Sequence, residues 1–314
     1  MCITCGCSDG AMATVTDLAT GTTHRVGAHA QHSHDHAEHE HGHEHGHGHG
    51  HEHEHEYQHA QHSHDHGHHE HDHAQQQDHD HGDDHHHEHA HRIRVTLEQE
   101  VLAKNNRLAE RNRGWLAGRN ILALNLVSSP GAGKTTLLER TIRDLGGTIP
   151  ISVVEGDQET TFDAERIRAA GCKSVQINTG TGCHLDAEML ARALNTLDPP
   201  TESLVMIENV GNLVCPALFD LGERAKLVIL SVTEGADKPL KYPHMFRACG
   251  LMILNKIDLL PHVDFDVDTC IGYARRVNPD IAVLQLSATT GQGLDRWYSW
   301  LRARLAAPDF EAAP

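Results

Sequence analysis

The sequence predicts an α/β fold: a mostly parallel sheet with helices on both faces, preceded by a disordered His-rich N-terminal region. The first observation is that short apolar runs alternate with amphipathic helical stretches, the runs lying at 121–127, 151–155, 174–177, 204–208, 226–232, 250–254 and 282–287. Strands that are apolar on both sides and separated by helices are typical of parallel sheets covered on both faces. The second observation is that the first run leads directly into the glycine-rich segment SSPGAGKTT.

Composition divides the 314-residue chain into unlike parts. Residues 29–91 hold 28 of the 32 histidines and 15 of the 44 acidic residues, and no Lys or Arg. This tract lacks the large apolar side chains whose burial could offset about 1–2 kcal/mol of backbone entropy per residue, so we expect it to be disordered. We therefore assign residues 1–10 to a Cys-rich metal-binding head, 11–28 to a linker, 29–91 to the His/acid tract and 92–314 to one globular domain.

The globular domain is expected to begin with a helix that ends near Gly118. Apolar residues recur at helical spacing after Thr96, the predicted N-cap, and Gln99 three residues later completes a capping box. The seven apolar runs then supply the strands, with helices between them.

Several classes of protein are excluded by composition. No run approaches the roughly 18–20 apolar residues of a transmembrane helix, and the N-terminus lacks the pattern of a signal peptide. We expect a cytoplasmic protein that contacts no membrane, in which the eight cysteines are thiols or metal ligands. The formal charge of −18 and the lack of a Lys/Arg patch argue against binding to nucleic acid.

The segment SSPGAGKTT (128–136) has the strand, loop and helix context of a Walker A motif, although Ser128 stands where the usual pattern has Gly. Backbone N–H groups of such a loop wrap a phosphate, the Lys reaches the terminal phosphates and the following hydroxyl binds Mg²⁺. The predicted nucleotide-binding residues of this loop are Gly131, Ala132, Gly133, Lys134, Thr135 and Thr136.

The identity of the base is predicted from NKID (255–258), at the end of a strand. Asp258 can accept hydrogen bonds from N1 and N2 of guanine, whereas adenine offers an acceptor at N1 and no amine at C2. Asn255 is expected to brace the base edge and the neighbouring loop, and the Lys256 stem to lie along the ring. After the last strand, a backbone N–H of Ser287 or Ala288 can reach guanine O6. Together these motifs predict GTP as the nucleotide.

Two N-terminal features point to metal binding. Cys2, Cys5 and Cys7 offer three thiolates within six residues, a chelate suited to Ni²⁺ or Zn²⁺. The tract 29–91 alternates imidazoles with carboxylates, which predicts a buffer that binds several ions loosely.

A third metal site is expected within the globular domain. Cys183 and His184 lie in the loop NTGTGCHLD, and Cys215 lies in ENVGNLVCP, each loop following a predicted strand. The carboxyl ends of parallel strands share one edge of the sheet, which is also the nucleotide's edge. Three ligands are one short of a closed tetrahedral site, so a water or a second subunit must complete it.

The ordered set of motifs resembles the hydrogenase nickel-incorporation GTPases, the HypB family, in the SIMIBI class of P-loop GTPases. The resemblance covers residues 92–306 and the head, and is carried by SSPGAGKTT, VVEGDQET, NTGTGCHLD, ENVGNLVCP and NKID after CxxCGC and a His tract. It implies a GTPase that forms a GTP-dependent homodimer and helps to insert nickel into the large subunit of [NiFe]-hydrogenase. It also implies a HypA-like metallochaperone as partner.

The resemblance also implies roles for individual residues. Asp157 corresponds to the switch I position, near Mg²⁺ and the attacking water, and Glu208 to the Walker B position. The expected catalytic residues are then Lys134 and Asp157, and the expected Mg²⁺ ligands are Thr135, Asp157 and Glu208.

Two alternatives remain open at this stage. The protein could be chiefly a nickel or zinc store with a secondary GTPase domain, and the core site could hold Ni²⁺ or Zn²⁺. A third interpretation, a GTPase of urease maturation, is disfavoured by the Cys-rich head and the Cys183-His184 pair.

Overall fold

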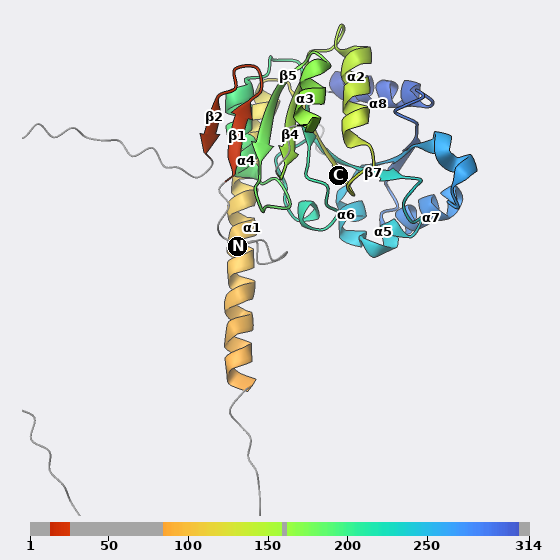
Figure 1. Ribbon diagram of the computed structural model, residues 1–314. Helices are drawn as coiled ribbons and strands as arrows, with labels where there is room; N and C mark the ends of the chain where they lie inside the picture. Colours follow the sequence, from red (N-terminus) through yellow and green to blue (C-terminus); the bar gives the residue numbers. More distant parts are fainter. Residues whose placement is uncertain (1–12, 26–83, 159–161, 308–314) are drawn as a thin grey trace, which may run out of the picture. The chain divides into compact units, whose positions relative to one another are not determined.

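The computed structural model describes residues 13–25, 84–158 and 162–307. The chain divides into two compact units, residues 1–28 with 89–314, and residues 29–88. In the first unit the described strands form one nine-stranded sheet in the order β2-β1-β5-β4-β6-β3-β7-β8-β9 (Figure 1). Of the second unit, the described residues are those that begin helix α1.

All seven predicted strands are confirmed, and all of them run parallel. They are β3 (Leu122–Ser128), β4 (Ile151–Asp157), β5 (Lys173–Asn178), β6 (Leu204–Glu208), β7 (Ala225–Ser231), β8 (Leu251–Asn255) and β9 (Ala282–Gln285). β3 lies between β6 and β7, so the loop that follows it opens at the centre of the sheet. Ligands of such sheets bind at this switch point, beyond the carboxyl ends of the strands.

The predicted linker 11–28 is wrong for its described residues. β1 (Thr14–Asp17) and β2 (Thr23–Arg25) form an antiparallel hairpin, and β1 adds to the sheet by antiparallel pairing with β5. Only Val15 of β1 is buried, so the segment has little apolar pattern of its own. Its strand conformation follows from pairing with β5, a long-range contact that local sequence does not reveal.

The first helix begins earlier than predicted. α1 extends over Asp84–Gly118, so Thr96 is not its N-cap, and the last part of the His/acid tract is helical. Extending an existing helix adds one hydrogen bond per residue without a new nucleus, and Glu is a good helix former while His is only a modestly poor one. The predicted end at Gly118 is confirmed. The rest of the tract, 29–83, lies outside the described residues.

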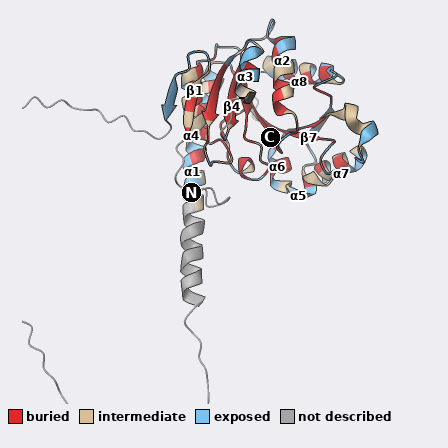
Figure 2. Ribbon diagram, in the orientation of Figure 1, coloured by how far each residue is buried: buried red, intermediate tan, exposed pale blue. Residues whose placement is uncertain are grey.

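Helices cover both faces of the sheet, and most strand residues are buried between them (Figure 2). One face packs against α2 (Lys134–Leu145), α3 (Phe162–Ala169) and α8 (Leu294–Ala306). The other packs against α1, α4 (Ala187–Leu197), α6 (Pro243–Ala248) and α7 (Val267–Val277). Shorter elements are η1 (Cys215–Ala217), α5 (Lys238–Lys241) and η2 (Ile257–His262). Among the described helices, none has the length and apolar character needed to cross a membrane.

Candidate functional site

The glycine-rich loop lies between β3 and α2, in the predicted order of strand, loop and helix. Gly133 precedes α2 with a φ of +97°, and a Cβ there would lie 2.5 Å from the Asn255 Nδ2 atom. The backbone conformation and the close approach both require glycine at this position. The N-terminus of α2 is thereby directed at the cavity, with the positive end of its dipole.

Ser128 stands where the usual Walker A pattern has Gly, and its hydroxyl makes two hydrogen bonds. Its hydroxyl donates to the Ser129 carbonyl at 2.6 Å and accepts a hydrogen bond from Lys134 Nζ at 2.9 Å. Lys134 is buried, so its ammonium needs such a partner. The serine therefore holds the lysine that the motif provides for phosphate.

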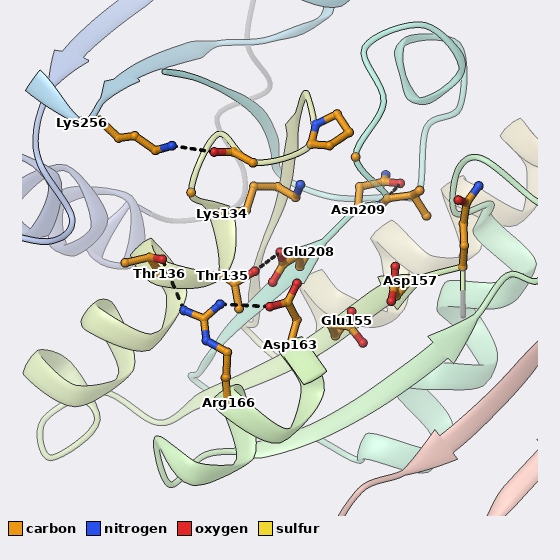
Figure 3. Close-up of a pocket in the computed structure, with 17 residues that line it drawn as sticks. Lys134, Thr135, Thr136, Glu155, Asp157, Asp163, Arg166, Glu208, Asn209 and Lys256 are labelled. Atoms are coloured by element: carbon orange, nitrogen blue, oxygen red, sulfur yellow. Dashed lines mark hydrogen bonds and ion pairs between the residues drawn. The ribbon is translucent and has the colours of Figure 1, made fainter. Parts of the chain in front are cut away.

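A cavity of about 460 Å³ opens at the carboxyl edge of the sheet, bounded by the glycine-rich loop and the ends of β4 and β6 (Figure 3). Thr135 Oγ1 donates to Glu208 Oε1 at 2.8 Å, which joins the first turn of α2 to the end of β6. Asp157 lies at the end of β4 and lines the same cavity. The three predicted Mg²⁺ ligands are therefore brought together.

The cavity also contains buried carboxylates with unused hydrogen-bonding capacity. Glu208 Oε2 and Glu155 Oε2 are buried without a hydrogen-bond partner among the described residues. Burial raises the pKa of Glu208 to about 7, against the opposing effect of Lys134. Burial and the nearby carboxylates Glu208 and Asp157 raise the pKa of Glu155 to about 9. A cation bound here would favour the charged forms of both groups, and carboxylate oxygens are the ligands that Mg²⁺ prefers.

Three charged residues of the cavity were missed by sequence analysis. Glu155 interrupts the apolar run of β4, and an acid inside a doubly buried strand was a usable signal. Asp163 and Arg166 come from α3, and Arg166 donates to Asp163 Oδ1 at 3.0 Å and to Thr136 Oγ1 at 3.4 Å (Figure 3). Nothing in the local pattern of α3 distinguished them from the charges of a solvent-exposed helix face.

The residues predicted to read the base lie beside the same loop. Asn255 is buried, donates to the Ala132 carbonyl at 2.9 Å and accepts from the Ala288 N–H at 3.2 Å. It therefore contacts the neighbouring glycine-rich loop, as expected, and also ties that loop to the segment after β9. Lys256 Nζ donates to the Gly131 carbonyl at 2.7 Å. Asp258 is the second residue of η2, and its Oδ1 is buried without a partner among the described residues.

The backbone N–H groups of Ser287 and Ala288, which were predicted to reach guanine O6, already donate hydrogen bonds within the protein. The Ser287 N–H donates to the Gln292 carbonyl at 2.9 Å, and the Ala288 N–H donates to Asn255 Oδ1 at 3.2 Å. Ala132, Asn255, Asp258, Ser287 and Ala288 are not among the residues lining the cavity, whereas the other predicted nucleotide-binding residues are.

The core metal residues are also brought together. One ligand atom from each of Cys183, His184 and Cys215 lies within 4.8 Å of the others, and Cys183 Sγ is 3.7 Å from His184 Nδ1. Burial lowers the pKa of His184 to about 4, so at neutral pH its imidazole has the neutral form that ligates metals. The ring packs on Phe219, with centroids 4.0 Å apart.

Cys183 and Cys215 come from the loops after β5 and β6. Val214 and Leu218, which flank Cys215, expose 52% and 42% of their surface, so apolar side chains border the ligand cluster. The predicted ligands Cys2, Cys5 and Cys7 lie outside the described residues.

The fold and the cavity together define a P-loop nucleotide-binding protein. A profile described as "CobW/HypB/UreG, nucleotide-binding domain" matches residues 122–285. "Hydrogenase maturation factor HypB" of Escherichia coli (strain K12) is 59% identical over 211 residues, which cover 67% of this chain and 73% of the relative. The chain therefore belongs to the CobW/HypB/UreG family, on its HypB branch.

Solved structures agree with this assignment. HypB from Archaeoglobus fulgidus is 41% identical, with a TM-score of 0.61 over 65% of this chain and 99% of that one. HypB from Helicobacter pylori, crystallised in complex with nickel, is 35% identical, with a TM-score of 0.61 over 64% of this chain and 95% of that one.

Proposed function

We propose that this protein is a GTP-hydrolysing nickel metallochaperone that helps to insert nickel into [NiFe]-hydrogenase. The observation that carries the proposal is the clustering of Cys183, His184 and Cys215 within 4.8 Å, on loops of the same sheet edge as the nucleotide cavity. Membership of the HypB branch supports hydrogenase maturation as the process, because the relatives are named for it.

In this proposal Lys134 and Asp157 act in hydrolysis, and Asp258 selects guanine. Thr135, Asp157 and Glu208 hold Mg²⁺, which neutralises charge on the phosphate oxygens. The buried, unpartnered Glu208 Oε2 fits a cation at this point. Gly131, Gly133 and the N-terminus of α2 bind phosphate through backbone N–H groups.

Nickel is the cargo in this scheme. The neutral His184 and two thiol groups form a nitrogen and sulfur donor set that suits Ni²⁺ and also Zn²⁺. We propose that residues 1–10 form a second site through Cys2, Cys5 and Cys7, and that the tract supplies a reserve of loosely bound ions.

We further propose a homodimer that forms in the GTP-bound state. Three ligands from one chain leave a four-coordinate ion incomplete, and a two-fold axis would present each ligand twice. Val214 and Leu218 supply exposed apolar surface beside the cluster for such a contact. The other proposed partners are a HypA-like metallochaperone and the hydrogenase large subunit.

The proposal is tested by transfer of nickel to a purified, nickel-free large subunit. We expect nickel on the re-isolated large subunit to depend on GTP and on the HypA-like protein, in the presence of a chelator that captures ions released to solution. The matched control is ATP in place of GTP. Equal transfer with ATP, or without nucleotide, would contradict a GTP-driven metallochaperone.

The second candidate is a nickel or zinc store whose GTPase domain is secondary. It is favoured by the 28 histidines of residues 29–91, a larger number of ligands than delivery of one ion requires. A store would hold and release metal independently of GTP, so the same transfer assay separates the two functions.

A further inference from the structure

Asn209 follows Glu208 at the end of β6, is 1% exposed and lines the nucleotide cavity (Figure 3). Its side chain makes three hydrogen bonds. Oδ1 accepts from the N–H groups of Leu185, at 3.2 Å, and Val210, at 3.0 Å. Nδ2 donates to Asn125 Oδ1 at 3.2 Å. One side chain thus joins the end of β6 to two other segments.

The first of these connections leads to His184. Leu185, whose N–H is bound by Asn209, is its immediate neighbour, and the Leu185 side chain packs against Gly156 on β4, where a Cβ would lie 2.8 Å from it. A displacement of Asn209 therefore shifts the backbone that carries the imidazole.

The second connection leads toward Cys215. Asn125 Nδ2 donates to Glu223 Oε1 at 3.0 Å, and Glu223 Oε2 accepts from the Leu221 N–H at 2.7 Å. Lys226 Nζ lies 3.8 Å from Glu223 Oε1. It donates to the carbonyls of Pro216, at 2.7 Å, and Phe219, at 3.0 Å.

Pro216 directly follows Cys215, and Phe219 lies three residues further along the chain. Lys226 therefore binds the segment 215–219 near both of its ends. Asn125, Glu223 and Lys226 are all buried. A buried polar network of this kind is rigid, because breaking one bond leaves buried groups without partners.

We infer that Asn209 is a positioning residue that couples the nucleotide site to the core metal site, through Leu185 on one side and the Asn125–Glu223–Lys226 network on the other. The inference rests on the proposed function, which places GTP and nickel at these two sites. Glu208 is adjacent to Asn209 and contacts Thr135, so a change in nucleotide state at Glu208 reaches both metal-ligand loops through one residue.

The coupling is measured as the ratio of core-site nickel affinities with a non-hydrolysable GTP analogue and with GDP. The full-length chain is used with Cys2, Cys5 and Cys7 changed to Ser, so that thiolate-to-nickel absorption reports the core site. A competing chelator sets the same free Ni²⁺ in both states, which keeps the loading of the tract equal.

The main variant is Asn125→Ala, because Asn125 neither lines the cavity nor belongs to the ligand cluster. Asn209→Ala removes both connections, and Asn209→Asp keeps the acceptor for Leu185 while removing the donor to Asn125. Asn278→Ala is the matched control, since Asn278 Nδ2 donates to the carbonyls of Phe246 and Cys249 near α6 and contacts neither metal-ligand loop.

We expect an affinity ratio of about 5-fold or more in the parent, falling to within about 2-fold of one in Asn209→Ala. Asn125→Ala and Asn209→Asp should give intermediate ratios, and Asn278→Ala the parent ratio. The thermal unfolding midpoint of each variant is measured as well. If Asn278→Ala and Asn125→Ala lower the midpoint equally but only Asn125→Ala lowers the affinity ratio, the lower ratio reflects lost coupling and not lost stability.

Two results would overturn the inference: a parent ratio of one, or variants that bind both ligands and retain the parent ratio. A parent that binds no GTP, or gives no thiolate absorption with Ni²⁺, would instead overturn the proposed function itself.

Discussion

Replacing Asp258 by Asn is expected to weaken GTP binding and to favour xanthosine triphosphate. Asp258 Oδ1 is buried and has no hydrogen-bond partner among the described residues, so it is available to a base. The bonds of Asn255 to Ala132 and Ala288 do not involve Asp258, so the loops around the base should keep their positions.

The size of the effect follows from the hydrogen bonds exchanged. Guanine presents two N–H donors to the carboxylate, and a hydrogen bond to a charged group contributes about 1.5–3 kcal/mol. The amide offers one acceptor and directs its own N–H₂ at the second donor, so at least one of the two bonds is lost. Because 1.4 kcal/mol is a factor of ten, the Kd for GTP should rise about 10- to 150-fold. The 2-oxo group of xanthine accepts from the new N–H₂, which should recover affinity.

The assay is titration calorimetry with non-hydrolysable analogues of the guanine, xanthine and adenine nucleotides. Asp280→Asn is the matched control, because Asp280 is an exposed Asp that undergoes the same change of charge. If Asp258→Asn leaves the preference for guanine over xanthine unaltered, or if the unmodified protein binds the ATP and GTP analogues equally, Asp258 does not read the base.

Three further predictions concern the loop, the tract and the metal site. Gly133→Ala should lower the thermal midpoint and abolish GTP binding, because the added Cβ would lie 2.5 Å from the Asn255 amide. The φ of +97° adds a backbone cost of about 1–2 kcal/mol. An unchanged midpoint and an unchanged Kd for GTP would refute this prediction. Deleting 29–83 should remove most of the Ni²⁺ bound at equilibrium dialysis and leave GTP hydrolysis nearly unchanged; retained capacity or lost hydrolysis would contradict the separate roles proposed for tract and domain. Cys215→Ala should abolish any metal-dependent increase of the dimer in sedimentation while Cys172→Ala does not, and equal behaviour of the two variants would remove the core site from the interface.

Most of the sheet could be predicted because the parallel strands other than the edge strand β9 are largely buried on both faces and therefore carry apolar runs. The hairpin β1–β2 could not, because its residues satisfy their backbone groups by pairing with β5 and only Val15 is buried. The start of α1 was missed for a related reason. The His-rich turns from Asp84 continue a helix that is already formed, so no cap or apolar period marks its beginning.

The candidate site was predictable where chemistry restricts residue type. Thiols, an imidazole and a glycine-rich loop stand out in a sequence because few residues can replace them. Ser128 was recognised as a departure from the motif, but its bond to Lys134 required coordinates. Asn209 carried no signal, since an Asn after a buried strand is ordinary and its role arises from contacts with Leu185 and Asn125.

The order of the strands explains why the two sites can affect one another. The loops bearing Cys183 and Cys215 follow β5 and β6, and β4 lies between these strands, ending at Asp157 in the nucleotide cavity. Gly156 lacks a side chain at the point where Leu185 packs onto β4, so the metal-ligand loop rests directly on the segment between Glu155 and Asp157. A change in the position of Asp157 with nucleotide state would then press on the loop that carries His184, in parallel with the connection through Asn209. The two metal-ligand loops therefore follow the two strands that flank β4, the strand that ends at Asp157.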